Sequence, residues 1–111
     1  MMVRLIRPVL KEIDEFHKVL YVVYHKYLPN KEFDKIKSVR DDFILKAEAI
    51  IKATLPKRLE AKTDEFATAA KELMEASKKL KITWATQDAD AIEKAVEFLH
   101  TKYQNLEKIF N

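Results

Sequence analysis

The stretch that decides the fold is RLIRPVLKEIDEFHKVLYVVYHKYL, residues 4–28. Its apolar residues recur at alternating spacings of three and four, at Ile6, Val9, Ile13, Phe16, Leu20, Val23 and Tyr27. That spacing collects them on one face of an α-helix and leaves the charged residues on the opposite face. Pro29 disfavours helical geometry in the residue before it, so the helix should end there. We therefore predict an amphipathic helix over about residues 4–28.

The same apolar pattern occurs three more times along the chain. A second helix is predicted over about residues 31–54, before Pro56, with a stripe formed by Phe33, Ile36, Val39 or Arg40, Phe43, Ala47, Ile50 and Thr54. A third helix should follow Thr63 as its N-cap and carries Phe66, Ala70, Leu73, Ser77, Leu80 and Trp84. A fourth, over about residues 89–110, should follow Asp88 as its N-cap and carries Ile92, Val96, Leu99, Tyr103, Leu106 and Phe110.

These four segments have similar lengths and are joined by short links. Such helices bury their apolar stripes by running up and down against one another. The sequence contains no glycine and only three prolines, which argues against the tight turns of hairpins and sheets. We therefore predict a single all-α domain over residues 1–111, folded as an antiparallel up-down-up-down four-helix bundle.

Composition excludes several classes of function. Without glycine the chain cannot form a glycine-rich phosphate loop, and without cysteine it cannot form a thiolate metal site or attach haem through thioethers. The longest aromatic and aliphatic run, residues 19–24, is far shorter than the roughly 20 residues of a membrane span. The 21 basic and 18 acidic residues are interspersed and give a net charge of +3, so we expect no nucleic-acid partner.

The chain also lacks a visible set of catalytic residues. Serine occurs only at Ser38 and Ser77, and neither has a nearby residue that would activate it as a nucleophile. We therefore expect a protein that is not an enzyme.

Histidine is the remaining residue type with metal or proton chemistry, and it occurs at His17, His25 and His100. Both His17 and His100 flank the apolar stripe of their helix. If the first and fourth helices are antiparallel neighbours, residue 100 lies within one turn of His17, so the two imidazoles should meet. His25 is predicted on the outer, solvated face, two turns or roughly 12 Å from His17, which is too far for the two to share a metal ion.

Each of these two flanking histidines has a carboxylate three residues earlier, Asp14 before His17 and Glu97 before His100. Two imidazoles with one carboxylate suit a divalent transition metal such as Zn²⁺, Cu²⁺ or Ni²⁺, so His17, His100, Asp14 and Glu97 are the candidate metal ligands. Two alternatives stay open. The carboxylate and histidine spacing also occurs in dimetal bundles, although both acids fall on outward positions here, and the histidines could instead be packing residues of the helix interface.

Residues 88–110, DADAIEKAVEFLHTKYQNLEKIF, resemble the last helix of the cytochrome c′ family. An acidic cap precedes the segment, and His100 and Tyr103 match the histidine of the haem-attachment motif and the aromatic residue that follows it. The two expected cysteines are Val96 and Leu99 here, so covalent haem attachment is excluded. The resemblance implies an up-and-down bundle and a periplasmic location, although residues 1–4 show no secretory signal.

Together these observations predict a cytochrome c′-like small binding module without haem, which binds a metal ion through histidines of the first and last helices. One alternative is a structural or protein-interaction bundle without a small ligand. Another is a protein that holds haem b non-covalently between His17 and His100. A homodimer is compatible with the sequence.

Overall fold

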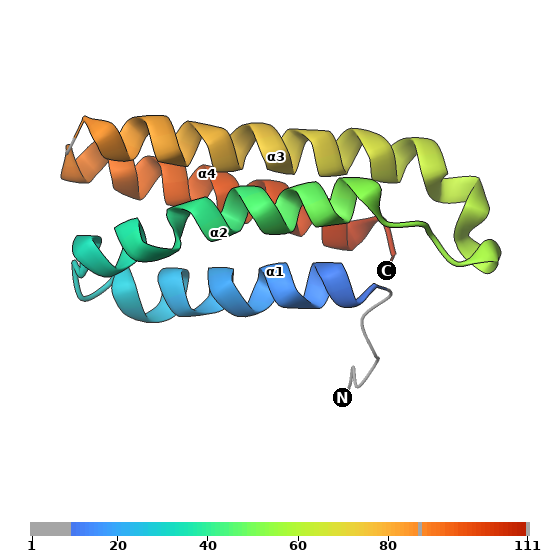
Figure 1. Ribbon diagram of the computed structural model, residues 1–111, viewed down its shortest axis with the longest axis horizontal. Coiled ribbons are helices and arrows are strands. Elements are labelled where there is room, and N and C mark those ends of the chain that lie inside the picture. The colour runs from blue at the N-terminus through green and yellow to red at the C-terminus, as the bar shows by residue number, and fades with distance from the viewer. Residues whose placement is uncertain (1–9, 87, 111) are drawn as a thin grey trace.

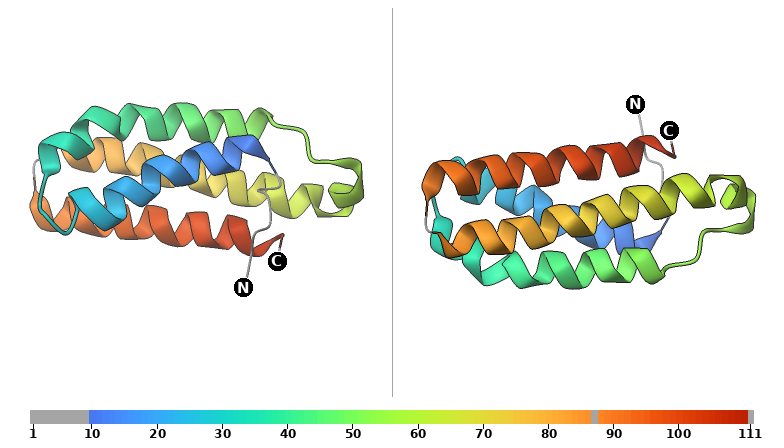
Figure 2. Two further views of the ribbon diagram at one scale, coloured as in Figure 1. Left: turned by 90° about the horizontal axis from the view of Figure 1, so that it is seen from below. Right: turned by 90° about the horizontal axis from the view of Figure 1, so that it is seen from above.

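The computed structural model describes residues 10–86 and 88–110, apart from the side chain of Arg58. Its four α-helices are α1 (Lys11–Val22), α2 (Phe33–Lys52), α3 (Thr63–Ala85) and α4 (Ala89–Lys108). Consecutive helices lie side by side and run in opposite directions along a body of 43 × 29 × 18 Å (Figure 1, Figure 2). These ranges contain no strand, which confirms the all-α four-helix prediction. They also contain no helix that combines the length and apolar character needed to cross a bilayer.

The four predicted stripes supply the core. Phe16 of α1 and Phe43 of α2 are completely buried and meet with ring centroids 5.3 Å apart. The following stripe residues are also buried: Ile13, Leu20, Val23, Ile36, Ala47, Ile50, Phe66, Ala70, Leu73, Ser77, Leu80, Trp84, Ile92, Val96, Leu99, Tyr103 and Leu106. Burial of these side chains is the main force that holds the helices together. Ile6 and Val9 of the predicted first stripe lie outside the described residues.

Two positions of the second stripe can now be compared with the prediction, namely Thr54 and the choice between Val39 and Arg40. Thr54 is exposed, because the chain leaves the helix at Ala53, whose φ of −72° and ψ of 150° are extended. Of the two candidates in the middle of the stripe, Val39 packs against the core, whereas the Arg40 guanidinium lies 5.5 Å from the ring centroid of Trp84. Val39 therefore contributes apolar contact to the core, and Arg40 contributes a cation–π contact at its edge.

The two predicted N-caps have different outcomes. The Asp88 carboxylate accepts hydrogen bonds from the backbone N–H groups of Asp90 (3.0 Å) and Ala91 (3.3 Å), so it caps α4 as predicted. The prediction for Thr63 is wrong, because Thr63 is itself the first residue of α3. Its hydroxyl donates to the Glu60 carbonyl oxygen at 2.6 Å, within the short 3₁₀-helix η2 (Lys57–Lys62) that leads into α3.

The first helix changes its winding near its end. After α1 the chain continues as a π-helix, η1 (Val23–Tyr27), in which the Leu28 N–H donates to the Val23 carbonyl oxygen at 2.8 Å. This bond spans five residues rather than four, so each residue advances less around the helix axis than in an α-helix. The predicted end of the first helix near residue 28 is therefore confirmed, but its last part is a π-helix, and the side chains of η1 are rotated relative to those of a continuous α-helix.

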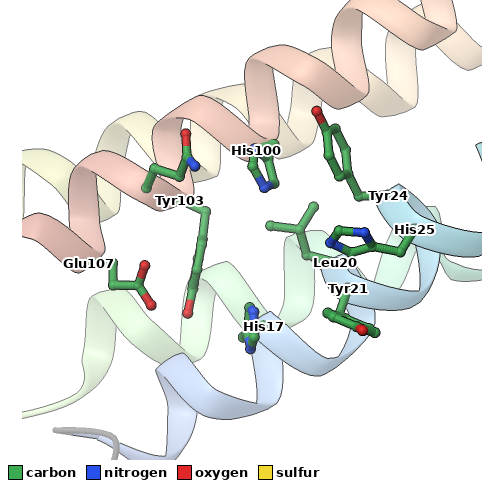
Figure 3. Close-up of a pocket in the computed structure, with 9 residues that line it drawn as sticks. His17, Leu20, Tyr21, Tyr24, His25, His100, Tyr103 and Glu107 are labelled. Carbon is green, nitrogen blue, oxygen red and sulfur yellow. The ribbon is translucent and has the colours of Figure 1, made fainter. Parts of the chain in front are cut away.

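Of the four interfaces between neighbouring helices, the one between the first and last helices has the fewest close backbone approaches. The backbone of α3 packs against both α2 and α4, and α1 packs against α2. By contrast, α4 approaches the first helix mainly at its π-helical end, η1. The space along this interface is occupied by large ring side chains, and the candidate site lies among them (Figure 3).

Candidate functional site

A small pocket lies between α1 and η1 on one side and α4 on the other (Figure 3). Its volume is about 80 Å³, and its lining residues are His17, Leu20, Tyr21, Tyr24, His25, His100, Tyr103, Gln104 and Glu107. All three histidines of the chain therefore line one pocket. The rest of the lining consists mainly of tyrosine rings and two polar side chains from the last turns of α4.

The two histidines predicted to meet both reach this pocket, but each is stacked on a tyrosine of the opposite helix. His100 of α4 lies against Tyr24 of η1, with ring centroids 4.0 Å apart and an angle of 7° between the planes. His17 of α1 lies against Tyr103 of α4, with centroids 5.3 Å apart and an angle of 14°. Each stack joins the first helix to the last, so these rings close the loosest interface of the bundle.

His25 was predicted on the solvated outer face, and it is exposed. It nevertheless lines the same pocket as His17 and His100, with its ring centroid 4.4 Å from that of Tyr21 and 5.4 Å from that of Tyr24. The physical reason is the π-helical winding of η1, which turns residues after Val22 back towards α4. An α-helical projection cannot reveal this placement.

The predicted carboxylate ligands do not belong to the pocket. Asp14 forms an ion pair with Lys18 at 3.3 Å, and neither Asp14 nor Glu97 is a lining residue. In residues 10–86 and 88–110, no three histidine, aspartate or glutamate side chains are placed to hold a metal ion together. The carboxylate that does line the pocket is Glu107.

Sequence reasoning missed Glu107 and Tyr24, and one signal would have found them. Glu107 follows His100 by seven residues, and Tyr24 follows His17 by seven. Residues seven apart lie on the same helix face, two turns from each other. Residues seven positions after each histidine therefore line the pocket, whereas the carboxylates three positions before do not.

The pocket favours a neutral imidazole at His100. Burial lowers the pKa of His100 below its ordinary value of 6.5, and the positive charges that His25 and His17 can carry lower it further. The Glu107 carboxylate opposes this shift but does not cancel it. His100 therefore keeps a free ring nitrogen lone pair near neutral pH.

Tyr103 is held in its protonated form. Burial raises the pKa of its phenol well above the usual range, and the negative charges of Glu107 and Asp14 raise it further. Its ring also lies parallel to that of Phe16, with centroids 6.0 Å apart. Tyr103 thus connects the hydrophobic core to the pocket and carries a hydroxyl group that stays a hydrogen-bond donor.

Comparison of the chain with family models, curated proteins and solved structures found no match. The resemblance of residues 88–110 to the last helix of cytochromes c′ therefore stays a prediction.

Proposed function

We propose that the protein is a cytochrome c′-like small binding module without covalent haem, and that its ligand is one divalent transition-metal ion. The ion would bind in the pocket between the first and last helices, with His100 and His17 as ligands. The observation that carries this proposal is the convergence of all three histidines on a single pocket. A periplasmic location, implied by the resemblance, belongs to the same proposal.

The size of the pocket supports an ion rather than an organic cofactor. A volume of about 80 Å³ exceeds the roughly 10–15 Å³ that one water molecule needs. It is well below the roughly 300–1,000 Å³ of pockets that enclose organic ligands. An ion with a few bound waters matches this space, whereas haem b held between His17 and His100 would require the two helices to separate.

The donor chemistry supports the same class of ligand. Zn²⁺, Cu²⁺ and Ni²⁺ all accept neutral imidazole nitrogens, and the lowered pKa of His100 keeps its ring neutral near pH 7. Glu107 and water would complete the coordination sphere in place of Asp14 and Glu97, which lie outside the pocket. Binding requires the rings of His17 and His100 to rotate away from Tyr103 and Tyr24, because the described side chains are not already arranged around an ion.

Calorimetric titration of Zn²⁺, Cu²⁺ and Ni²⁺ into the metal-free protein tests the proposal. We expect one ion per chain with a Kd below about 0.1 mM for at least one of the three metals. His100→Ala should weaken that binding at least about tenfold, because it removes an inner ligand. Glu97→Gln is the matched control on the same helix and should leave the Kd unchanged, because Glu97 lies outside the pocket.

Two outcomes would overturn the proposal. One is binding weaker than about 0.1 mM for all three metals. The other is equal affinity in the wild-type protein and in His100→Ala, which would place the ion elsewhere on the surface. Circular dichroism of each variant before titration shows whether it keeps its helical content, so lost binding can be separated from lost folding.

A further inference from the structure

A second hollow lies between α3 and α4 and shares no residue with the histidine pocket. Its volume is about 380 Å³, and its lining residues are Lys79, Thr83, Ala91, Lys94, Ala95 and Phe98. We call it the α3–α4 groove. Its surface is mostly apolar, it opens broadly to solvent, and none of its lining residues is acidic.

Phe98 is the main apolar residue of the α3–α4 groove and it is poorly covered. Phe98 is 40% exposed, whereas Tyr103, which also belongs to α4, is buried. The ammonium groups of Lys79 and Lys102 each lie 5.1 Å from the centroid of the Phe98 ring. Cation–π attraction to these two ammonium groups stabilises the ring at the surface, where it is still partly exposed and can contact a further apolar group.

The two charged residues that line the α3–α4 groove are both lysines, Lys79 and Lys94. Lys102 forms an ion pair with Glu72 at 3.3 Å. Lys79 and Lys94, which line the groove, form no ion pair with any carboxylate in the part of the chain that the structure describes. An apolar surface with two ammonium groups that form no ion pair in the described residues complements a ligand that is both apolar and anionic.

We propose that the α3–α4 groove is the docking site for an acidic segment of a partner protein. One large apolar side chain of that segment would pack beside Phe98, and its flanking carboxylates would pair with Lys79 and Lys94. The open shape favours such a segment over a small molecule, because small-molecule sites enclose most of the ligand surface. This mode of recognition needs only one anchoring side chain and two charge pairs on an already folded bundle.

Nuclear magnetic resonance with the ¹⁵N-labelled full chain tests this proposal. The probes are short acidic peptides of aspartate and glutamate around a single central leucine, phenylalanine or tryptophan. We expect at least one peptide to bind with a Kd below about 1 mM and to shift the amide signals of residues 91–98 and of Lys79 and Thr83. A peptide with lysine in place of every acid, and an acidic peptide with a central serine, should both bind at least about tenfold more weakly.

Two matched pairs of variants separate the groove from general charge and hydrophobicity. Lys79→Glu combined with Lys94→Glu should weaken peptide binding at least about tenfold. Lys11→Glu combined with Lys26→Glu on the first helix changes the net charge equally and should leave peptide binding unchanged. Phe98→Ala should weaken peptide binding at least about tenfold, whereas Leu45→Ala, which removes an exposed apolar side chain from α2, should have no effect.

Three results would overturn the proposal. The first is a Kd weaker than about 1 mM for every acidic peptide. The second is equal loss of affinity in the first-helix double variant and the groove double variant. The third is binding to vesicles of phosphatidylserine and phosphatidylcholine that depends on Phe98 while no peptide binds, because the groove would then serve a membrane surface.

Discussion

The imidazole ring of His100 lies parallel to the phenol ring of Tyr24, with 4.0 Å between their centroids. This contact joins the π-helical end of the first helix to the middle of the last helix (Figure 3). It also covers one face of the imidazole, and burial is the largest cause of the lowered pKa of His100. Packing and protonation at this site are therefore linked.

The pKa of His100 can be measured directly by following its ring signals with pH. We expect a value below 6.5, because burial disfavours the charged imidazolium and the charges of His25 and His17 add to that effect. His25→Gln should move the pKa of His100 back towards 6.5 by removing one of those charges. A pKa at or above 6.5 in the wild-type protein would contradict the explanation that burial and the neighbouring charges disfavour the charged form of His100.

The same shift makes stability depend on pH with a defined sign. Above pH 6.5, His100 is neutral in both the folded and the unfolded chain and contributes no pH dependence. As the pH falls from 6.5 through the lower folded-state pKa, the unfolded chain binds its proton first, so the free energy of unfolding decreases. Urea unfolding at about pH 7.5 and about pH 5.5 measures this change. The free energy of unfolding should decrease less between these two pH values in His100→Gln than in the wild-type protein.

Metal affinity, like the free energy of unfolding, should decrease as the pH falls. A metal ion and a proton compete for the same imidazole nitrogen, so affinity falls once the solution pH drops below the pKa of a ligand. The loss should approach about tenfold per pH unit for each imidazole that must release a proton. Calorimetry with Zn²⁺ in buffers of different ionisation enthalpy would report the number of protons released. Binding that is independent of pH between about 7.5 and 5.5 would argue against histidine ligands.

Phe16 connects the core to the pocket through its contact with Tyr103. It is completely buried and contacts both Phe43 and Tyr103. Phe16→Ala should lower the free energy of unfolding by about 3–5 kcal/mol, because it removes buried apolar surface and leaves a cavity. Urea unfolding measures the change. Leu45→Ala, at a position that is 62% exposed, is the control and should change stability by no more than about 0.5 kcal/mol.

The cap of α4 can be tested by a pair of substitutions at one position. Asp88→Ala should cost about 0.5–2 kcal/mol, because the N–H groups of Asp90 and Ala91 lose their acceptor. Asp88→Asn keeps a side-chain oxygen at the same place and should cost much less. Thermal unfolding followed by circular dichroism distinguishes the two. Equal destabilisation by both substitutions would mean that the charge of Asp88, rather than its hydrogen bonds, stabilises the helix.

The candidate site was predictable only in part. His17 and His100 lie beside their apolar stripes, and both line the pocket between the first and last helices, but each imidazole stacks on a tyrosine and not on the other histidine as predicted. The partners of these histidines were not predicted, because a three-residue spacing to Asp14 and Glu97 suggested ligands that lie outside the pocket. The aromatic stacks and the position of His25 in the pocket depend on contacts between segments far apart in the sequence. The spacing of residues within one helix does not predict such contacts.

By itself the sequence determined the four amphipathic helices and most of the core, because the spacing of apolar residues fixes which face of a helix must leave water. It also determined the Asp88 cap, since a side-chain acceptor before a helix satisfies N–H groups that no other local group can reach. Only the tertiary structure decided that Tyr24 stacks on His100 and that all three histidines share one pocket. These contacts depend on the five-residue hydrogen bond of η1 and on the pairing of helix ends far apart in sequence, and both are set by packing across the whole bundle.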